Sequence, residues 1–225
     1  MVSETQNTAN RHRRSQSERR EQTRFRILEA ATELYAEQGF FAVTMRDIAT
    51  RAGVALGLIY HYFEGKEQLL AEQIEYTTQI WLDGVRGHLV GREFDSLDDF
   101  LVDYLMYMRR FIQVEHPNYF RFYMKHIHLD NLPHLEYMFT RVAGIQPIFN
   151  EQITAAIKRG EISADLSREM VEFVVEMVSS RVQEACYSDF LGMDLGLVAA
   201  DETTARRRIR EVVRAGLSGL RAKKN

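Results

Sequence analysis

Apolar residues recur at helical spacing along most of the chain. The first such stripe predicts a helix that starts at residue 17 or 18 and ends before Gly39, and it consists of Ile27, Ala31, Leu34 and Tyr35. Glycine ends a helix readily because a residue without a Cβ atom adopts positive φ at little cost. No segment alternates between apolar and polar residues as a half-buried strand does. The pattern therefore predicts an all-α chain with nine or ten helices.

The remaining helices follow from the same spacing and from capping residues. Ser167 and Asp201 are expected to begin the last two helices, because their side chains can accept hydrogen bonds from free backbone N–H groups. Pro147 is expected to kink the helix that contains it. In chain order, these helices are expected at about 45–51, 55–62, 66–90, 96–114, 117–129, 133–159, 167–191 and 202–221.

The short helices at 45–51 and 55–62 have the layout of a helix-turn-helix, which places its second helix in the DNA major groove. Thr44 and Asp47 are predicted to form a capping box, and Gly53 lies at the turn between the helices. The second helix is too short to be stable alone, so it is expected to dock on the first and present its other face to a partner. The apolar seam between the two helices consists of Ile48, Ala49, Ala52, Val54 and Ile59.

This stretch resembles the N-terminal domain of the TetR family of transcriptional regulators. The likeness is specific over about residues 22–72 and rests on Ala49, Ala52-Gly53-Val54, Gly57, Ile59-Tyr60, Tyr62-Phe63, Lys66-Glu67 and Leu69-Leu70. The resemblance implies an N-terminal three-helix DNA-binding domain followed by a helical domain that binds a ligand and dimerises. Beyond residue 72, only the number and length of the helices fit the family.

The resemblance also implies where the DNA backbone would be bound. Family members commonly touch phosphates at the positions that match Thr44, Gly57, Tyr60, Tyr62 and Lys66. Additional basic residues in the same region are candidates for phosphate contacts, namely Arg46 and either Arg24 or Arg26. Such contacts position a protein on DNA but carry no sequence information.

The predicted recognition helix departs from the family pattern, which often has polar residues at the positions of Ala55, Leu56 and Leu58. The helix carries no Arg, Lys, Asn or Gln, the residues that form bidentate hydrogen bonds with guanine or adenine. We therefore expect these three apolar side chains to contact thymine methyl groups. His61 or Arg46 is expected to supply polar base contacts, and DNA shape the remaining specificity.

Charge is distributed unevenly, although the net charge is only −3. Residues 11–26 hold seven arginines against two glutamates, a net of +5, whereas residues 67–225 hold 19 basic and 24 acidic side chains, a net of −5. A basic end on a mildly acidic body suits a protein that meets phosphate at one end. We expect a disordered basic arm at 1–16, a helix-turn-helix domain at 17–65 and a ligand-binding and dimerisation domain at 66–225, with the second boundary in a long helix.

The last two helices are apolar over so wide an arc that burial on two sides is expected. One side would face the chain's own domain and the other a second copy, giving the four-helix dimer interface that the resemblance also implies. The residues expected at this interface are Phe173, Val174, Val178, Val182, Ile209, Val213, Gly216 and Leu220.

Residues 100–149 are dense in aromatic rings and methionine. At helical spacing such residues usually form a core, but a surplus of rings with polar tips also suits a pocket for an apolar ligand. We expect a lipophilic small-molecule effector, and its candidate contacts are Tyr104, Met108, Phe111, Phe122, His126, Phe139, Met177 and Arg181.

These features predict a sequence-specific DNA-binding transcriptional regulator, namely a repressor that binds a palindromic operator as a homodimer and is released by the effector. An activator of the same fold and an architectural DNA-binding protein of low specificity are the alternatives. Neither an enzyme nor a bound metal or cofactor is expected, because the sequence contains no HExxH, CxxC, GxSxG, P-loop or dinucleotide-binding glycine pattern. A cytoplasmic location is expected, since no apolar run could span a bilayer and the single cysteine, Cys186, cannot form an internal disulfide.

Overall fold

The computed structural model describes residues 2–126, 143–187 and 195–222, with their side chains except for residues 2–15, 126 and 143. Within these ranges the elements are helices, together with one isolated antiparallel pair of residues, Ile162 and Arg221. The all-α prediction is confirmed.

The chain divides into two compact units. Unit 1 comprises Met1–Thr77 and Phe122–Tyr137, and unit 2 comprises Thr78–Arg121 and Met138–Asn225. Helices α4 (Lys66–Leu89) and α6 (Pro117–His126) each contribute residues to both units. One division between the units therefore falls inside α4, after Thr77.

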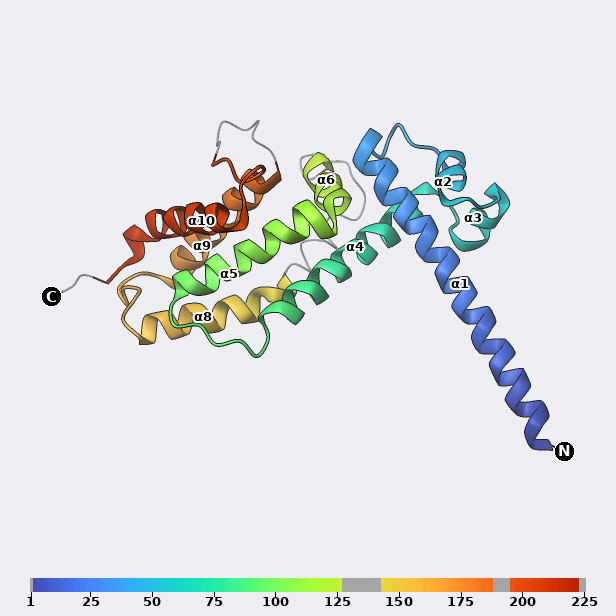
Figure 1. The fold of residues 1–225 in the computed structure, drawn as a ribbon, viewed down its shortest axis with the longest axis horizontal. Coiled ribbons are helices and arrows are strands. Elements are labelled where there is room, and N and C mark those ends of the chain that lie inside the picture. The colour runs from blue at the N-terminus through green and yellow to red at the C-terminus, as the bar shows by residue number, and fades with distance from the viewer. Residues whose placement is uncertain (1, 127–142, 188–194, 223–225) are drawn as a thin grey trace. The chain divides into compact units, whose positions relative to one another are not determined.

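Unit 1 is built on α1 (Val2–Gln38), and α2 (Met45–Ala52) and α3 (Leu56–Tyr62) lie beside its C-terminal half (Figure 1). Apolar side chains from four helices form its core, and they include Ile27, Leu28, Leu34, Ile48, Ile59, Leu69 and Leu70. The expected stripe of α1 is buried in this core. Burial of these side chains is the main term that stabilises helices as short as α2 and α3.

A polar pair and an aromatic cluster also lie inside unit 1. The Gln73 side-chain amide donates to the Thr32 hydroxyl at 3.2 Å. The Tyr35 ring lies 5.5 Å from Phe40 and 6.2 Å from Phe122 of α6. The Tyr35 hydroxyl is buried without a hydrogen-bond partner among the described residues, and burial raises its pKa well above the ordinary value.

The first helix begins earlier than predicted. We expected a disordered arm over residues 1–16, but the structure continues α1 to Val2. No glycine or proline precedes Gly39, so the local backbone contains nothing that stops the helix. The expectation of disorder rested on the missing apolar periodicity, which indicates only that no apolar stripe runs along this part of the helix.

Unit 2 is organised around α5 (Leu97–Arg110), which packs against α8 (Gln146–Lys158), α9 (Arg168–Tyr187) and α10 (Glu202–Gly216) (Figure 1). A helix that is buried around most of its circumference needs apolar residues on nearly every face. The buried side chains of α5 are Leu97, Phe100, Leu101, Val102, Tyr104, Leu105, Met106, Tyr107 and Met108.

Several helix ends in unit 2 differ from the sequence prediction. A π-helical turn, η1 (Phe111–Glu115), ends the predicted 96–114 helix, and short 3₁₀ turns, η2 (Ala143–Ile145) and η4 (Ser218–Leu220), flank α8 and α10. Pro147 lies in the first turn of α8, so it begins a helix and does not kink one; proline is tolerated there because the first N–H groups have no partner within the helix. The predicted segments 127–129, 133–142 and 188–191 lie outside the described residues.

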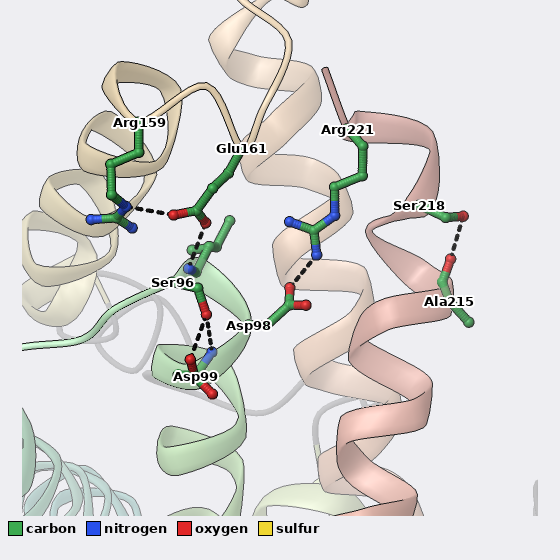
Figure 2. A network of polar contacts seen from close by, with 9 residues as sticks. Ser96, Asp98, Asp99, Arg159, Glu161, Ala215, Ser218 and Arg221 are labelled. Atoms are coloured by element: carbon green, nitrogen blue, oxygen red, sulfur yellow. Dashed lines mark hydrogen bonds and ion pairs between the residues drawn. The ribbon is translucent and has the colours of Figure 1, made fainter. Parts of the chain in front are cut away.

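A polar network fixes the N-terminus of α5 against the end of the chain (Figure 2). The Glu161 carboxylate accepts a hydrogen bond from the Leu97 N–H at 2.9 Å and pairs with Arg159, while Asp98 pairs with Arg221. Ser96 caps α5 by accepting from the Asp99 N–H at 3.1 Å. The free N–H groups at the start of the central helix are thus satisfied by one local residue, Ser96, and by one distant residue, Glu161.

Candidate DNA interface

The helix-turn-helix is held in place by the predicted cap and turn. The Thr44 N–H donates to Asp47 Oδ2 at 2.8 Å, and the Asp47 N–H donates to Thr44 Oγ1 at 3.2 Å, which completes the capping box. The Thr44 hydroxyl also donates to Asp47 Oδ2, and this hydrogen bond, together with the one from the Thr44 N–H, lowers the pKa of Asp47 because both favour the charged carboxylate. Gly53 ends α2 with φ of +65°, a left-handed conformation that side chains other than Asn rarely adopt without strain.

Helix α3 is anchored on one face and exposed on the other. Ile59 is fully buried, and Phe63, directly after the helix, is buried as well. Leu58 and Tyr60 are 38% and 53% exposed. Ala55, Gly57 and His61 are also exposed, whereas Leu56 and Tyr62 are half-buried. The predicted recognition residues therefore form an outward surface on a docked helix, with Leu58 more accessible than Leu56.

The remaining predicted phosphate contacts differ in their exposure and in the contacts that they already make within the chain. Arg46 and Thr44 are exposed, but the Thr44 hydroxyl already donates to Asp47 Oδ2. The Lys66 ammonium lies 4.4 Å from the Phe40 ring centroid and donates to the Phe41 carbonyl oxygen at 3.4 Å. Partial burial lowers the pKa of Lys66, opposed by the charges of Glu67 and Asp47.

Arg24, another predicted phosphate contact, is paired within its own chain. Its guanidinium pairs with the Glu72 carboxylate of α4, with Nε 3.1 Å from Oε2. The positive charge that we assigned to phosphate is therefore neutralised within unit 1. Sequence reasoning missed this pairing because the two residues are 48 positions apart. Arg26, the alternative, is exposed.

Two side chains of unit 1 lie next to the predicted site and were not predicted. The Arg20 guanidinium carbon is 5.9 Å from the Tyr62 ring centroid, within the range of a cation–π contact. Phe41, between α1 and α2, is 68% exposed and contacts the Phe40 ring edge-on at 5.3 Å. An arginine one helical turn before Arg24 was the available sequence signal for the first of them.

Helix α6 supplies a cap for α1. The Lys125 ammonium donates to the carbonyl oxygens of Ala36 at 3.1 Å and Glu37 at 2.7 Å, in the last turn of α1. The last carbonyl groups of a helix have no partner within it and carry partial negative charge, so an ammonium is favourable there. This contact fixes the chain where it turns through Gly39 toward α2.

The predicted effector contacts do not gather around one cavity in the described part of the chain. Tyr104, Met108 and Phe111 are buried along α5 and η1 in unit 2, and the Tyr104 ring packs edge-on against Phe149 at 5.0 Å. Phe122 is buried in unit 1. The His126 side chain and Phe139 lie outside the described side chains.

Two of these predictions need correction. Met177 is 47% exposed and Arg181 is exposed, with its guanidinium 2.7 Å from Glu184. Both lie on the outer face of α9, because its inner face is filled by valines that pack within unit 2. A shallow hollow elsewhere, on α10, contains none of the predicted residues and is lined by Leu195, Gly196, Arg208, Glu211, Val212 and Ala215.

The predicted dimer residues fall into two groups. Phe173 is 62% exposed and Val174 is half-buried on α9. The others form the core of their own unit, which corrects the prediction: Val178, Val182, Ile209, Val213 and Leu220 are buried. A Cβ atom on Gly216 would overlap Val178 Cγ2, so this glycine allows α10 to approach α9 within the chain. Met170 and Met177 extend the exposed apolar face of α9 instead.

Other expectations concern chemistry outside DNA binding. Cys186 is buried, and burial raises the pKa of its thiol to about 12, which fits the interpretation as a small apolar core residue. Among the residues with described side chains, no group of three His, Cys, Asp or Glu could hold a metal ion. None of the described helices combines the length and apolar character needed to cross a membrane.

Comparison with known proteins identifies relatives of both halves. The family model for bacterial regulatory proteins of the tetR family matches residues 27–72. The repressor KstR2 of Mycolicibacterium smegmatis is 26% identical over 145 residues, which are 64% of this chain and 70% of that protein. The regulator HbdR of Aromatoleum sp. is 46% identical over 50 residues, or 22% of each chain. With HbdR, the similarity is thus confined to less than a quarter of the relative's length.

Solved structures share the fold over most of the chain. FadR of Bacillus subtilis, solved with stearoyl-CoA, is 20% identical with a TM-score of 0.67, covering 85% of this chain and 98% of that one. KstR2 of Mycobacterium tuberculosis, a ketosteroid transcriptional regulator, is 20% identical with a TM-score of 0.58, covering 89% and 95%. These proteins are named as transcriptional regulators, in line with the expectation of a non-enzymatic protein. Residues 27–72, which include the capped helix-turn-helix, therefore carry the N-terminal domain of bacterial regulatory proteins of the tetR family.

Proposed function

We propose that the protein is a transcriptional repressor that binds a palindromic operator as a homodimer and is released by a lipophilic small molecule. The observation that carries the DNA-binding part is the two-sided burial of α3, with Ile59 fully buried and Leu58 and Tyr60 exposed. A helix of seven residues is too short to be stable alone, so its buried face holds it in place and its exposed face is available to a partner. The name of the M. smegmatis relative supports repression.

Base recognition is proposed to depend on apolar contacts. Leu58 and Ala55 are exposed on α3 and would lie against thymine methyl groups, with Leu56 at the edge of this surface. His61 and Arg46 are exposed and can donate hydrogen bonds to base edges. Because each bidentate contact that is missing forgoes about 1–3 kcal/mol of discrimination, two half-sites and DNA shape would supply the rest.

The homodimer is proposed to form through the outer face of α9. Met170, Phe173 and Met177 are 51%, 62% and 47% exposed and recur at i, i+3 and i+7, which puts them on one face. Three large apolar side chains on one exposed face favour a protein partner over solvent. A twofold dimer would present two α3 helices to half-sites about one helical turn of DNA apart.

The effector is proposed to be largely apolar. Support comes from the aromatic and methionine side chains buried along α5, among them Tyr104, Met108 and Phe111. Related folds are solved with stearoyl-CoA or named for ketosteroids. Helix α4 contributes to both units, so a shift of this helix on ligand binding would change the spacing of the two recognition helices.

A pair of glycine substitutions tests the DNA interface. Gly57 on α3 and Gly87 on α4 are both helical, and an added Cβ would meet nothing within 4 Å at either position. Gly57→Ala and Gly87→Ala should therefore fold equally well. If the α3 backbone approaches DNA at Gly57, only Gly57→Ala should weaken binding to a duplex from the protein's own promoter, by about tenfold, which corresponds to about 1.4 kcal/mol. Equal affinity of both variants would contradict the proposed interface.

Site selection and ligand titration test the remaining parts. Random-duplex selection should yield a palindrome, and Leu58→Ala should lose the preference for thymine at one position in each half-site. Binding without any preferred sequence would support the architectural alternative instead.

The release by an effector is tested by titration. At least one of two ligands, stearoyl-CoA or a ketosteroid, should reduce the affinity of the protein for its operator. Unchanged affinity at saturation with a small molecule that co-purifies with the protein would rule out release by an effector.

A further inference from the structure

Arg20 lies where α1 passes the end of the recognition helix. Its guanidinium carbon is 5.9 Å from the ring centroid of Tyr62, the last residue of α3. Tyr62 also contacts the His61 ring edge-on at 5.7 Å. The contact with Tyr62 thus holds the charge of Arg20 at the end of the helix that exposes Tyr60 and His61.

A comparison with Arg24 explains why this charge is available. The two arginines are four residues apart on α1 and therefore on the same face of the helix. Arg24 pairs with Glu72, whereas no carboxylate pairs with Arg20 among the side chains that the structure describes. Glu18 and Glu21 are close in sequence, but they are two and one positions away and do not lie on the same face.

We infer that Arg20 is a phosphate-binding residue of the DNA interface, positioned by the Tyr62 ring. The guanidinium of arginine matches the geometry of phosphate oxygens and can bind them bidentately, while its flat face stays on an aromatic ring. Arg20 would extend the interface from the helix-turn-helix onto α1. The inference rests on the proposed function, because it assumes that the outer face of α3 meets duplex DNA.

The salt dependence of DNA binding tests this inference. The dissociation constant for a duplex that carries the selected operator is measured against salt concentration for the wild type and for Arg20→Gln. Each lost phosphate contact should reduce the slope of log affinity against log salt by about 0.9. Arg20→Gln should reduce the slope by this amount for each subunit bound and leave the sequence preference unchanged, since phosphate contacts carry no sequence information.

Arg24→Gln is the matched control, because it removes the same charge from the same face of α1. Its slope should equal that of the wild type, since Glu72 already neutralises Arg24. Tyr62→Phe keeps the ring and removes an uncharged hydroxyl that is itself a predicted phosphate contact, so the affinity should fall while the slope contributed by Arg20 is retained. Arg20→Lys keeps the charge without the bidentate geometry and should bind with an affinity between those of the wild type and Arg20→Gln.

The outcomes separate the inference from the proposed function. If the wild type binds its operator specifically and Arg20→Gln has the wild-type slope, the role of Arg20 is overturned and the proposed function stands. Equal slope losses in Arg20→Gln and Arg24→Gln would also overturn it, since they would indicate a general charge effect. If the wild type binds no duplex with any preference, both the proposed function and the inference fail.

Discussion

Helices α3 and α9 both leave apolar side chains in solvent, but they do so in different chemical settings. On α3 the exposed Leu58 lies beside Tyr60 and His61, which can donate hydrogen bonds, and the helix is only seven residues long. On α9 the exposed Phe173 lies between two methionines on a 20-residue helix. A surface that mixes apolar and hydrogen-bonding groups suits nucleic acid, whereas a purely apolar one suits another protein chain.

The largest expected effect on stability comes from substituting a buried apolar residue of unit 2, in comparison with an exposed one. Ile209→Ala should lower the free energy of unfolding by about 2–5 kcal/mol, because Ile209 is fully buried in its own chain. Phe173→Ala should instead remove the dependence of stability on protein concentration, since Phe173 lies on the proposed dimer face of α9. Unfolding in urea at two protein concentrations distinguishes the two effects. Similar behaviour of both variants would mean that the division of α9 and α10 into core and outer face is incorrect.

Substitution of one glycine in each unit should destabilise the protein for two different reasons. Gly216→Ala places a methyl group against Val178, whose branched side chain cannot turn away easily, so a loss of about 1–3 kcal/mol is expected from overpacking. Gly53→Ala has open space but a φ of +65°, and the left-handed conformation should cost about 1–2 kcal/mol. Substitution by Asn separates the two causes in thermal melts. Gly53→Asn should recover part of the loss because Asn tolerates this conformation, whereas Gly216→Asn should not.

The cap from α6 onto α1 should have a smaller effect. Lys125→Met keeps most of the aliphatic chain but removes the donor to Ala36 and Glu37, and about 1 kcal/mol of stability should be lost. Hydrogen exchange should accelerate in the last turn of α1 and spare α10. Lys158→Met, at the last residue of α8 in unit 2, is the control. Unchanged exchange in α1 would mean that the cap does not stabilise this turn.

The smallest effect concerns pH. Asp47 has a lowered pKa in the folded protein, so its contribution to stability is present above the ordinary pKa of 3.8 and is lost as the pH falls through the lower folded value. Asp47→Asn should therefore be less stable than the wild type at neutral pH, and the difference should shrink as the pH falls below 3.8, in urea unfolding at each pH. A constant difference at all pH values would show that the charge of Asp47 is not responsible.

Local features of both units were predictable from the sequence because neighbouring residues determine them. The capping box of Thr44 and Asp47, the turn at Gly53 and the caps at Ser167 and Asp201 all depend on residues within four positions of one another. The exposed face of α3 was predicted because Ile59 and the apolar seam were expected to dock the opposite face of this helix.

Features that depend on distant residues were not predictable. Periodicity marked Val178, Val182 and Ile209 as apolar, but it cannot distinguish burial within a chain from burial between chains. Arg24 is paired by a residue 48 positions away, and Lys125 caps a helix 88 positions before it. Pro147 was consistent with either a kink or a helix start, and only the fold decides between them.

The cap of Lys125 on α1 has a consequence for how the protein is made. Unit 1 is discontinuous, since it needs residues from Phe122 onward in addition to Met1–Thr77. During translation, the amino-terminal helices emerge from the ribosome well before the residues that complete their packing. A fragment ending at Thr77 would lack both the Phe122 ring and the Lys125 cap, so unit 1 can reach its full stability only after about 125 residues have been synthesised.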